Sequence, residues 1–216
     1  MVPAKKIVFW IFVLVFAYAI VRYNIIRDVP ISDIPLFISN KAVALASVII
    51  IGMAFVIGPL TRFFPRTFEK LHPLRKSLGL WGFGLAALHA LISIVLLGPK
   101  YYSKFYLPDG GLNLVGQSSL LFGAMAFMVF AIVAITSLPY MEEVLGRTRW
   151  RSVQRLGYSA YFLVLLHVFI MGFSGWFNPS AYQYGFVSIS LLAALVIILV
   201  LLLRILVAFI PRRSRR

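Results

Sequence analysis

Six apolar stretches, each about long enough to cross a bilayer, constrain the fold of this 216-residue chain more than any other feature. An α-helix rises about 1.5 Å per residue, so a hydrocarbon core of about 30 Å takes roughly 20 apolar residues. The connections between the stretches are short, and the sequence shows no internal repeat or soluble domain. We therefore predict an all-α, polytopic membrane protein, a bundle of six transmembrane helices that forms one domain over residues 1–216. The expected helices cover residues 7–26, 41–60, 77–97, 114–136, 156–176 and 184–210.

The charges indicate how the helices are oriented. The net charge of +15 would suggest a nucleic-acid ligand in a soluble protein, but 62% of the residues are hydrophobic and the cations lie mainly in loops and tails. Of the 21 lysines and arginines, sixteen fall on the side of the two termini and the second and fourth loops, and five on the other. The positive-inside rule then predicts that both termini are cytoplasmic, that membrane lipid surrounds the chain and that no nucleic acid binds. No small-residue cleavage site follows the first apolar run, so we expect a retained first helix.

Two of the three histidines, His89 and His167, lie inside expected helices. Each stands about a dozen residues after a cationic cluster, at residues 75–76 and 151–155. If both clusters mark one face of the membrane, both imidazoles lie ~18–20 Å from that face, at the same depth. An ionisable side chain there is costly unless it has a partner, and two facing imidazoles suit heme iron.

Other interpretations of the two histidines remain open. Each could hydrogen-bond a neighbouring helix, as polar groups in membranes commonly do. They could also line a path for a metal ion or a proton, although all six acidic residues fall in loops or tails, which is unlike a proton-coupled carrier. The chain has no cysteine, which excludes disulfides, thiolate zinc sites, cysteine-held iron–sulfur clusters and covalent c-type heme.

Three residues outside the expected helices carry weaker signals. His72 stands beside a proline among charges and is expected to be a solvated loop residue. Lys100 and Lys104 lie in an aromatic-rich outer loop, where long cationic stems settle at the membrane interface. The alternative is that one of these lysines meets heme propionates or an anionic substrate on the outer face.

Several motifs resemble a known family. They are GPLTR at residues 58–62, RKSLGLWGFGLAALH at 75–89, and W-x-x-V-Q-R-L-x-Y at 150–158. These segments are similar to the ferric reductase-like transmembrane domain family, and within it to the heme-binding membrane subunits of bacterial methionine sulfoxide reductases, the MsrQ or YedZ type. The resemblance covers the second to fifth expected helices, and it places the axial heme ligands of the family on His89 and His167.

The resemblance implies a multi-pass protein of the bacterial inner (plasma) membrane that binds heme b and transfers electrons across the bilayer. The electron donor would be a cytoplasmic flavin, supplied by a flavin reductase, or a quinol from the quinone pool. The acceptor would lie on the outer face, and it could be a periplasmic molybdenum-containing reductase subunit, a ferric chelate or oxygen. In this role the protein is an electron-transfer subunit of the oxidoreductase type, with no catalytic acid or base of its own.

One position departs from the family pattern. The family usually has a second histidine thirteen residues before the later one, and here that position is Gln154. Glutamine is a poor heme ligand, so we expect one bis-histidine heme toward the outer half; a second heme near the cytoplasmic face would need another ligand, for which His72 is the weak alternative. Gln154 and Arg155 are instead candidate contacts for a flavin such as FMN, or for a quinone.

Overall fold

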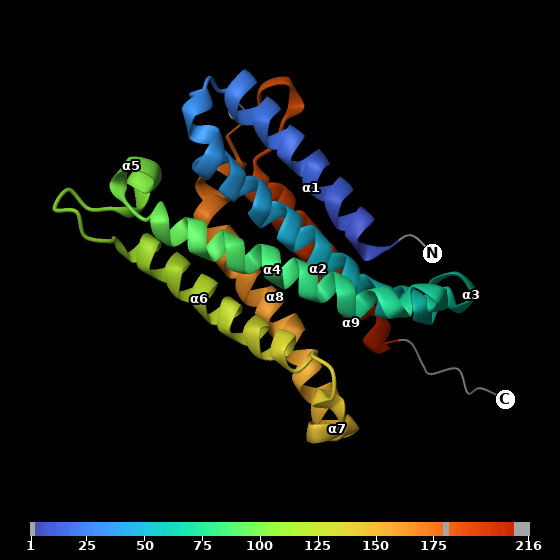
Figure 1. The fold of residues 1–216 in the computed structure, drawn as a ribbon. Helices are drawn as coiled ribbons and strands as arrows, with labels where there is room; N and C mark the ends of the chain where they lie inside the picture. Colours follow the sequence, from blue (N-terminus) through green and yellow to red (C-terminus); the bar gives the residue numbers. More distant parts are fainter. Residues whose placement is uncertain (1–2, 179–181, 210–216) are drawn as a thin grey trace.

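The computed structural model describes residues 3–178 and 182–209, and within them the chain is helical with no β-strand. Six helices are long and apolar enough to span a membrane, which confirms the predicted polytopic fold. Figure 1 shows them running side by side along one bundle. These helices are α1 (Ala4–Ile20), α2 (Ser39–Phe63), α4 (His72–Val95), α6 (Leu114–Ile135), α8 (Arg147–Trp176) and α9 (Ile189–Phe209).

Short helical segments fill the connections between the spanning helices. Those before α4 are the π-helices η1 (Val21–Ile25) and η3 (Ile34–Ile38), the 3₁₀ turns η2 (Ile31–Asp33) and η4 (Glu69–Leu71), and α3 (Pro65–Phe68). Those after α4 are α5 (Pro99–Tyr102), η5 (Ser103–Phe105), α7 (Met141–Leu145) and η7 (Gln183–Gly185). Because α5 and α7 lie at opposite ends of the bundle, we call these ends the α5 end and the α7 end (Figure 1).

The helix boundaries differ from the prediction most clearly at the α7 end. Helix α4 begins at His72 and α8 at Arg147, so the polar segments before both apolar stretches are helical as well. His72 is exposed as predicted, but its assignment to a loop was wrong. A proline follows it in the first turn of α4, where the missing N–H costs nothing and the fixed φ favours a helix.

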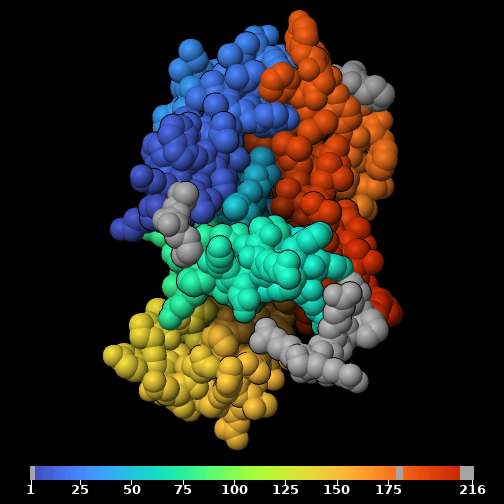
Figure 2. Space-filling view, turned by 90° about the vertical axis from the view of Figure 1, so that its right-hand side faces the viewer, coloured from blue at the N-terminus to red at the C-terminus, as the bar shows by residue number. Residues whose placement is uncertain are grey.

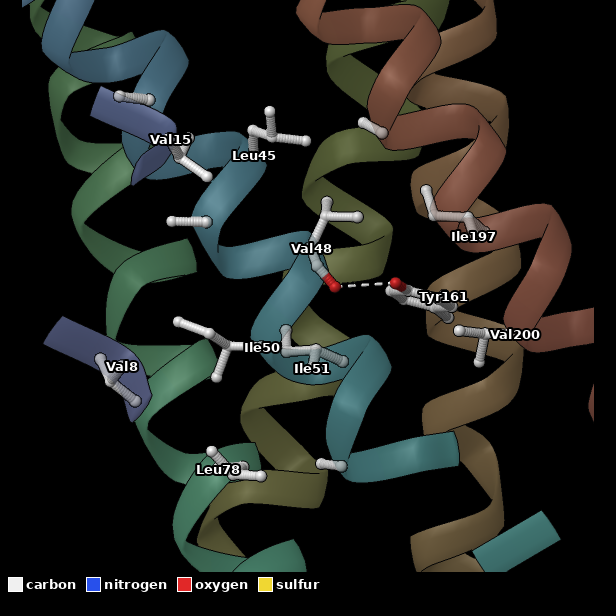
Figure 3. Close-up of a cluster of buried hydrophobic side chains, with 14 of the residues drawn as sticks. Val8, Val15, Leu45, Val48, Ile50, Ile51, Leu78, Tyr161, Ile197 and Val200 are labelled. Atoms are coloured by element: carbon white, nitrogen blue, oxygen red, sulfur yellow. Dashed lines mark hydrogen bonds between the residues drawn. The ribbon is translucent and has the colours of Figure 1, made fainter. Parts of the chain in front are cut away.

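Helix α2 lies at the centre of the bundle and packs against α1, α4 and α9, while α6 packs mainly against α8. Figure 3 shows part of this core, built mainly from branched aliphatic side chains, with the fully buried ring of Tyr161 on the side of Ile197 and Val200 and facing Val48. The Tyr161 hydroxyl donates a hydrogen bond of 2.8 Å to the carbonyl oxygen of Val48. This bond satisfies the hydroxyl of a fully buried ring, and it joins α8 to α2.

The flank of α4 away from α2 is loosely packed. Only 11% of the residues in its most apolar stretch are buried, against 61% in α2. Helix α4 contacts α6 only lightly and, within the described residues, hardly touches α8. On another face, Figure 2 shows a furrow between α1 and α9, with α2 at its floor; apolar side chains such as Ile7, Met53 and Val196 line a hollow of about 300 Å³ there.

Candidate functional site

His89 is held by a polar group at the α5 end of the bundle. Its Nδ1 atom lies 2.8 Å from Oδ1 of Asn40, which is at the start of α2 and only 2% exposed. The Asn40 amide nitrogen donates in turn to the Ser93 hydroxyl at 2.9 Å and approaches the Tyr102 hydroxyl at 3.4 Å. Since an amide oxygen can only accept a hydrogen bond, the proton of a neutral His89 ring is on Nδ1. The Nε2 atom then carries a free lone pair.

His167 is held by the main chain of α6. Its Nδ1 atom lies 2.8 Å from the carbonyl oxygen of Ser119 and 3.2 Å from the hydroxyl of the same residue. The ring packs against Gly123, where a Cβ atom would lie 3.0 Å from Nδ1. A carbonyl oxygen also only accepts, so in His167 too the proton is on Nδ1 and the lone pair on Nε2.

Both Nε2 atoms are available to a ligand. Neither makes a hydrogen bond within the described part of the chain, and neither is among the buried polar atoms left without a partner, so each opens onto accessible space. The two imidazoles lie close enough to interact electrostatically, although they belong to different helices that hardly touch. A histidine whose Nδ1–H is anchored by an oxygen acceptor and whose Nε2 is free is the usual form of a metal ligand.

Two histidine donors suit a metal that brings its own ligands better than an ion held by protein side chains alone. Within residues 3–178 and 182–209 no group of three or more His, Cys, Asp or Glu side chains could surround an ion. Two imidazoles alone do not complete a coordination shell, so the remaining ligands must come with the metal. A flat macrocycle that supplies four equatorial nitrogens needs two further ligands, and imidazoles with an open Nε2 are donors of the kind that supply them.

Gln154 and Arg155 lie at the α7 end, away from the paired histidines. The Gln154 amide nitrogen donates to the carbonyl oxygen of Val133 at 3.2 Å and to the Thr136 hydroxyl at 3.0 Å, so its side chain joins α8 to the end of α6. The Arg155 side chain is exposed. The structure therefore gives Gln154 a packing role and leaves Arg155 as the side chain there that is free to meet a ligand.

The two lysines of the connection between α4 and α6 differ from one another. Lys100 is exposed and stacks on the ring of Tyr101. Lys104 stacks on Phe105 and donates a hydrogen bond to the carbonyl oxygen of Met171, one turn beyond His167 on α8. Burial lowers the pKa of Lys104, and the nearby ammonium of Lys41 lowers it further. Lys104 is thus the one of the two that contacts α8, the helix that carries His167.

Sequence reasoning missed the residues that hold the imidazoles, namely Asn40, Ser119 and Gly123. Asn40 and Ser119 are polar residues at the edges of apolar stretches, and such residues are common at membrane interfaces. They lie 49 and 48 positions before their histidines, so only the packing of the helices brings them together.

The fold and this site define a class, the multi-pass membrane proteins that carry two histidines on separate helices, each with Nδ1 anchored by an oxygen and Nε2 without a hydrogen bond. The family model for the ferric reductase like transmembrane component matches residues 42–165, more than half of the chain. The chain belongs to that family, as the motifs had indicated. The matched region includes His89 and ends just before His167.

Individual relatives agree with this assignment. The chain is 28% identical over 138 residues to the protein-methionine-sulfoxide reductase heme-binding subunit MsrQ of Pasteurella multocida, with 64% of this chain and 61% of that protein covered. It is 28% identical over 155 residues to MsrQ of Cronobacter sakazakii, with 71% of each chain covered. It is 26% identical over 214 residues to the human metalloreductase STEAP2, with 85% of this chain and 42% of that protein covered. The chain thus spans less than two thirds of the Pasteurella and human relatives.

Proposed function

We propose that this protein is a heme b-binding electron-transfer subunit of the membrane, with His89 and His167 as the axial ligands of one heme. The observation that carries the proposal is that both imidazoles have the same tautomer and the same pattern of hydrogen bonds. Each donates Nδ1–H to an oxygen at 2.8 Å and leaves Nε2 open, from helices that hardly touch. The name of the MsrQ relatives, which are heme-binding subunits, supports the same ligand.

The chain's own residues prepare the site. Asn40 and Ser119 fix the tautomer and the orientation of the rings, and hydrogen bonds of this kind also make a ligating imidazole more basic. A bound heme supplies one-electron chemistry, which needs no acid or base from the protein, and that agrees with the position of every acidic residue outside the membrane core.

The distribution of cationic residues indicates the direction of electron transfer across the membrane. With the cation-rich α7 end in the cytoplasm of a bacterial inner membrane, electrons would enter there and leave at the α5 end. The donor would be a quinol or a flavin such as FMN near Gln154 and Arg155, with Arg155 as the charged contact. The acceptor would be a partner on the outer face, such as a periplasmic molybdenum-containing reductase subunit. The name of STEAP2, a metalloreductase, leaves a ferric chelate as another acceptor of the same site.

The test is heme content measured on the detergent-purified protein. The oxidised and dithionite-reduced visible spectra should show a low-spin b-type heme, and a pyridine hemochrome assay should give about one heme per chain. His89→Ala and His167→Ala should each remove most of it, whereas His72→Ala, which alters an exposed histidine, should not. Full heme content in the first two variants would refute the ligand assignment. No heme in the parent protein would refute the function and favour a histidine-lined ion path, which flux into liposomes would detect.

A further inference from the structure

The α5 end carries positive charge beside the paired histidines. Lys41 directly follows Asn40, the residue that anchors His89, and it interacts electrostatically with that imidazole. Its ammonium lies 4.2 Å from the ring centroid of Phe37 and 5.1 Å from that of Tyr23, which fixes the side chain at the start of α2. One cation is therefore held at the start of α2, in the same turn as the residue that anchors His89.

A second cation is held next to His167. The Lys104 ammonium donates to the carbonyl oxygen of Met171, one turn after His167 on α8, and stacks on Phe105 at 4.8 Å. Lys104 and Lys41 also interact electrostatically with each other. The two lysines thus lie at the α5 end of the bundle, Lys41 beside the anchor of His89 in the chain and Lys104 bound to the helix that carries His167.

Neither lysine has an anionic partner among the residues that the structure describes. In the described residues no carboxylate lies within ion-pair distance of either, and the charged neighbours of Lys41 are the cations Arg22 and Arg27. Arg22 is only 2% exposed, donates to the carbonyl oxygen of Phe186, and keeps an Nε atom without a partner. Like charges that are partly removed from water repel one another unless an anion lies among them.

We propose that Lys41 and Lys104 bind a pair of carboxylates at the α5 end of the bundle, and that these are the two propionates of the heme held by His89 and His167. This inference rests on the proposed function. A heme carries both propionates on one edge, and the two lysines lie at one end of the bundle, on the α5 side of the histidines. They therefore fix which way the macrocycle faces, with its charged edge toward the α5 end and its apolar edge toward the bilayer interior.

A comparison of heme with its dimethyl ester tests this directly, because esterification removes both propionate charges and leaves the iron unchanged. Each ligand is loaded into the full-length protein, and its rate of loss to apomyoglobin is measured. The parent protein should lose the ester about 10- to 100-fold faster than heme, since hydrogen bonds to charged groups are worth roughly 1.5–3 kcal/mol. In the double variant Lys41→Gln/Lys104→Gln the ratio should fall toward one.

Matched variants separate charge from structural damage. Lys41→Arg/Lys104→Arg keeps both charges and should keep most of the discrimination, and Lys100→Gln, at an exposed lysine, should leave it unchanged. Equal ratios in the parent protein and the double glutamine variant would overturn the inference. If the ratios are equal but citrate shifts the Soret band only in the parent protein, the lysines bind a free carboxylate instead, which also overturns it. Absence of any Soret band would show that the proposed function itself had failed.

Discussion

The contact between Gly123 and the His167 ring offers a sharp test of how the site is built. In Gly123→Ala, the new Cβ atom would lie 3.0 Å from Nδ1, 3.3 Å from Cε1 and 3.6 Å from Cγ of His167. Two of these separations are shorter than ordinary van der Waals contacts, so the ring must move by a few tenths of an ångström. The ring is tied to the Ser119 carbonyl oxygen at 2.8 Å, and a movement of that size weakens this bond or tilts the ligand.

The expected cost of Gly123→Ala follows from two opposing effects. Overpacking of this kind typically lowers the free energy of unfolding by about 1–3 kcal/mol, while replacing a helical glycine by alanine raises it by about 1 kcal/mol. Loss of a well-placed partner of a ligating histidine lowers metal affinity by roughly 10- to 100-fold. We therefore expect faster heme loss, by about tenfold or more, and a changed low-spin visible spectrum, with little change in the thermal midpoint of the heme-free protein.

The matched control for this prediction is Gly79→Ala, since a Cβ atom at Gly79 in α4 would meet nothing within 4 Å. This variant should gain a little helix stability and lose heme at the parental rate. If Gly123→Ala binds heme with the parental spectrum and the parental rate of loss, an alanine at position 123 does not displace the His167 ring. The prediction drawn from that contact is then wrong.

Three further predictions concern the groups around the site. Asn40→Leu removes the acceptor of His89 Nδ1, so heme affinity should fall roughly 10- to 100-fold in a heme-transfer assay, and an unchanged rate would contradict the proposed anchor. Gln154→Leu removes the bonds between α8 and α6, which should lower the thermal midpoint while heme per chain stays constant. Tyr161→Phe deletes one buried hydrogen bond to Val48 and should cost about 1 kcal/mol of stability, again at constant heme content.

The helices could be predicted from the sequence because the bilayer demands long apolar segments. Their ends could not, because hydropathy marks where the membrane lies and not where the backbone leaves the helix. Helices α4 and α8 therefore begin at His72 and Arg147, well before their apolar stretches. Polarity alone predicts a loop for the cationic residues of these first turns, although lysine and arginine are good helix formers.

The histidines could also be found in the sequence, because an ionisable group inside an apolar stretch is rare. Their partners could not. Asn40 reaches His89 and Ser119 reaches His167 only through the rotation and the relative height of neighbouring helices. Lys41 was missed for a related reason, since a lysine at the start of an apolar stretch usually marks the membrane boundary.

One imidazole is anchored by a side chain and the other by the main chain. Substitutions can therefore change the hydrogen bond of one ring more easily than that of the other. The acceptor of His89 is a side chain, so a single codon change at Asn40 can alter how strongly that ring donates electrons. The acceptor of His167 is a main-chain carbonyl oxygen, which every residue type provides. Mutation can therefore adjust the site gradually from the α2 side, whereas the α6 side offers a fixed reference that sequence drift at position 119 leaves in place.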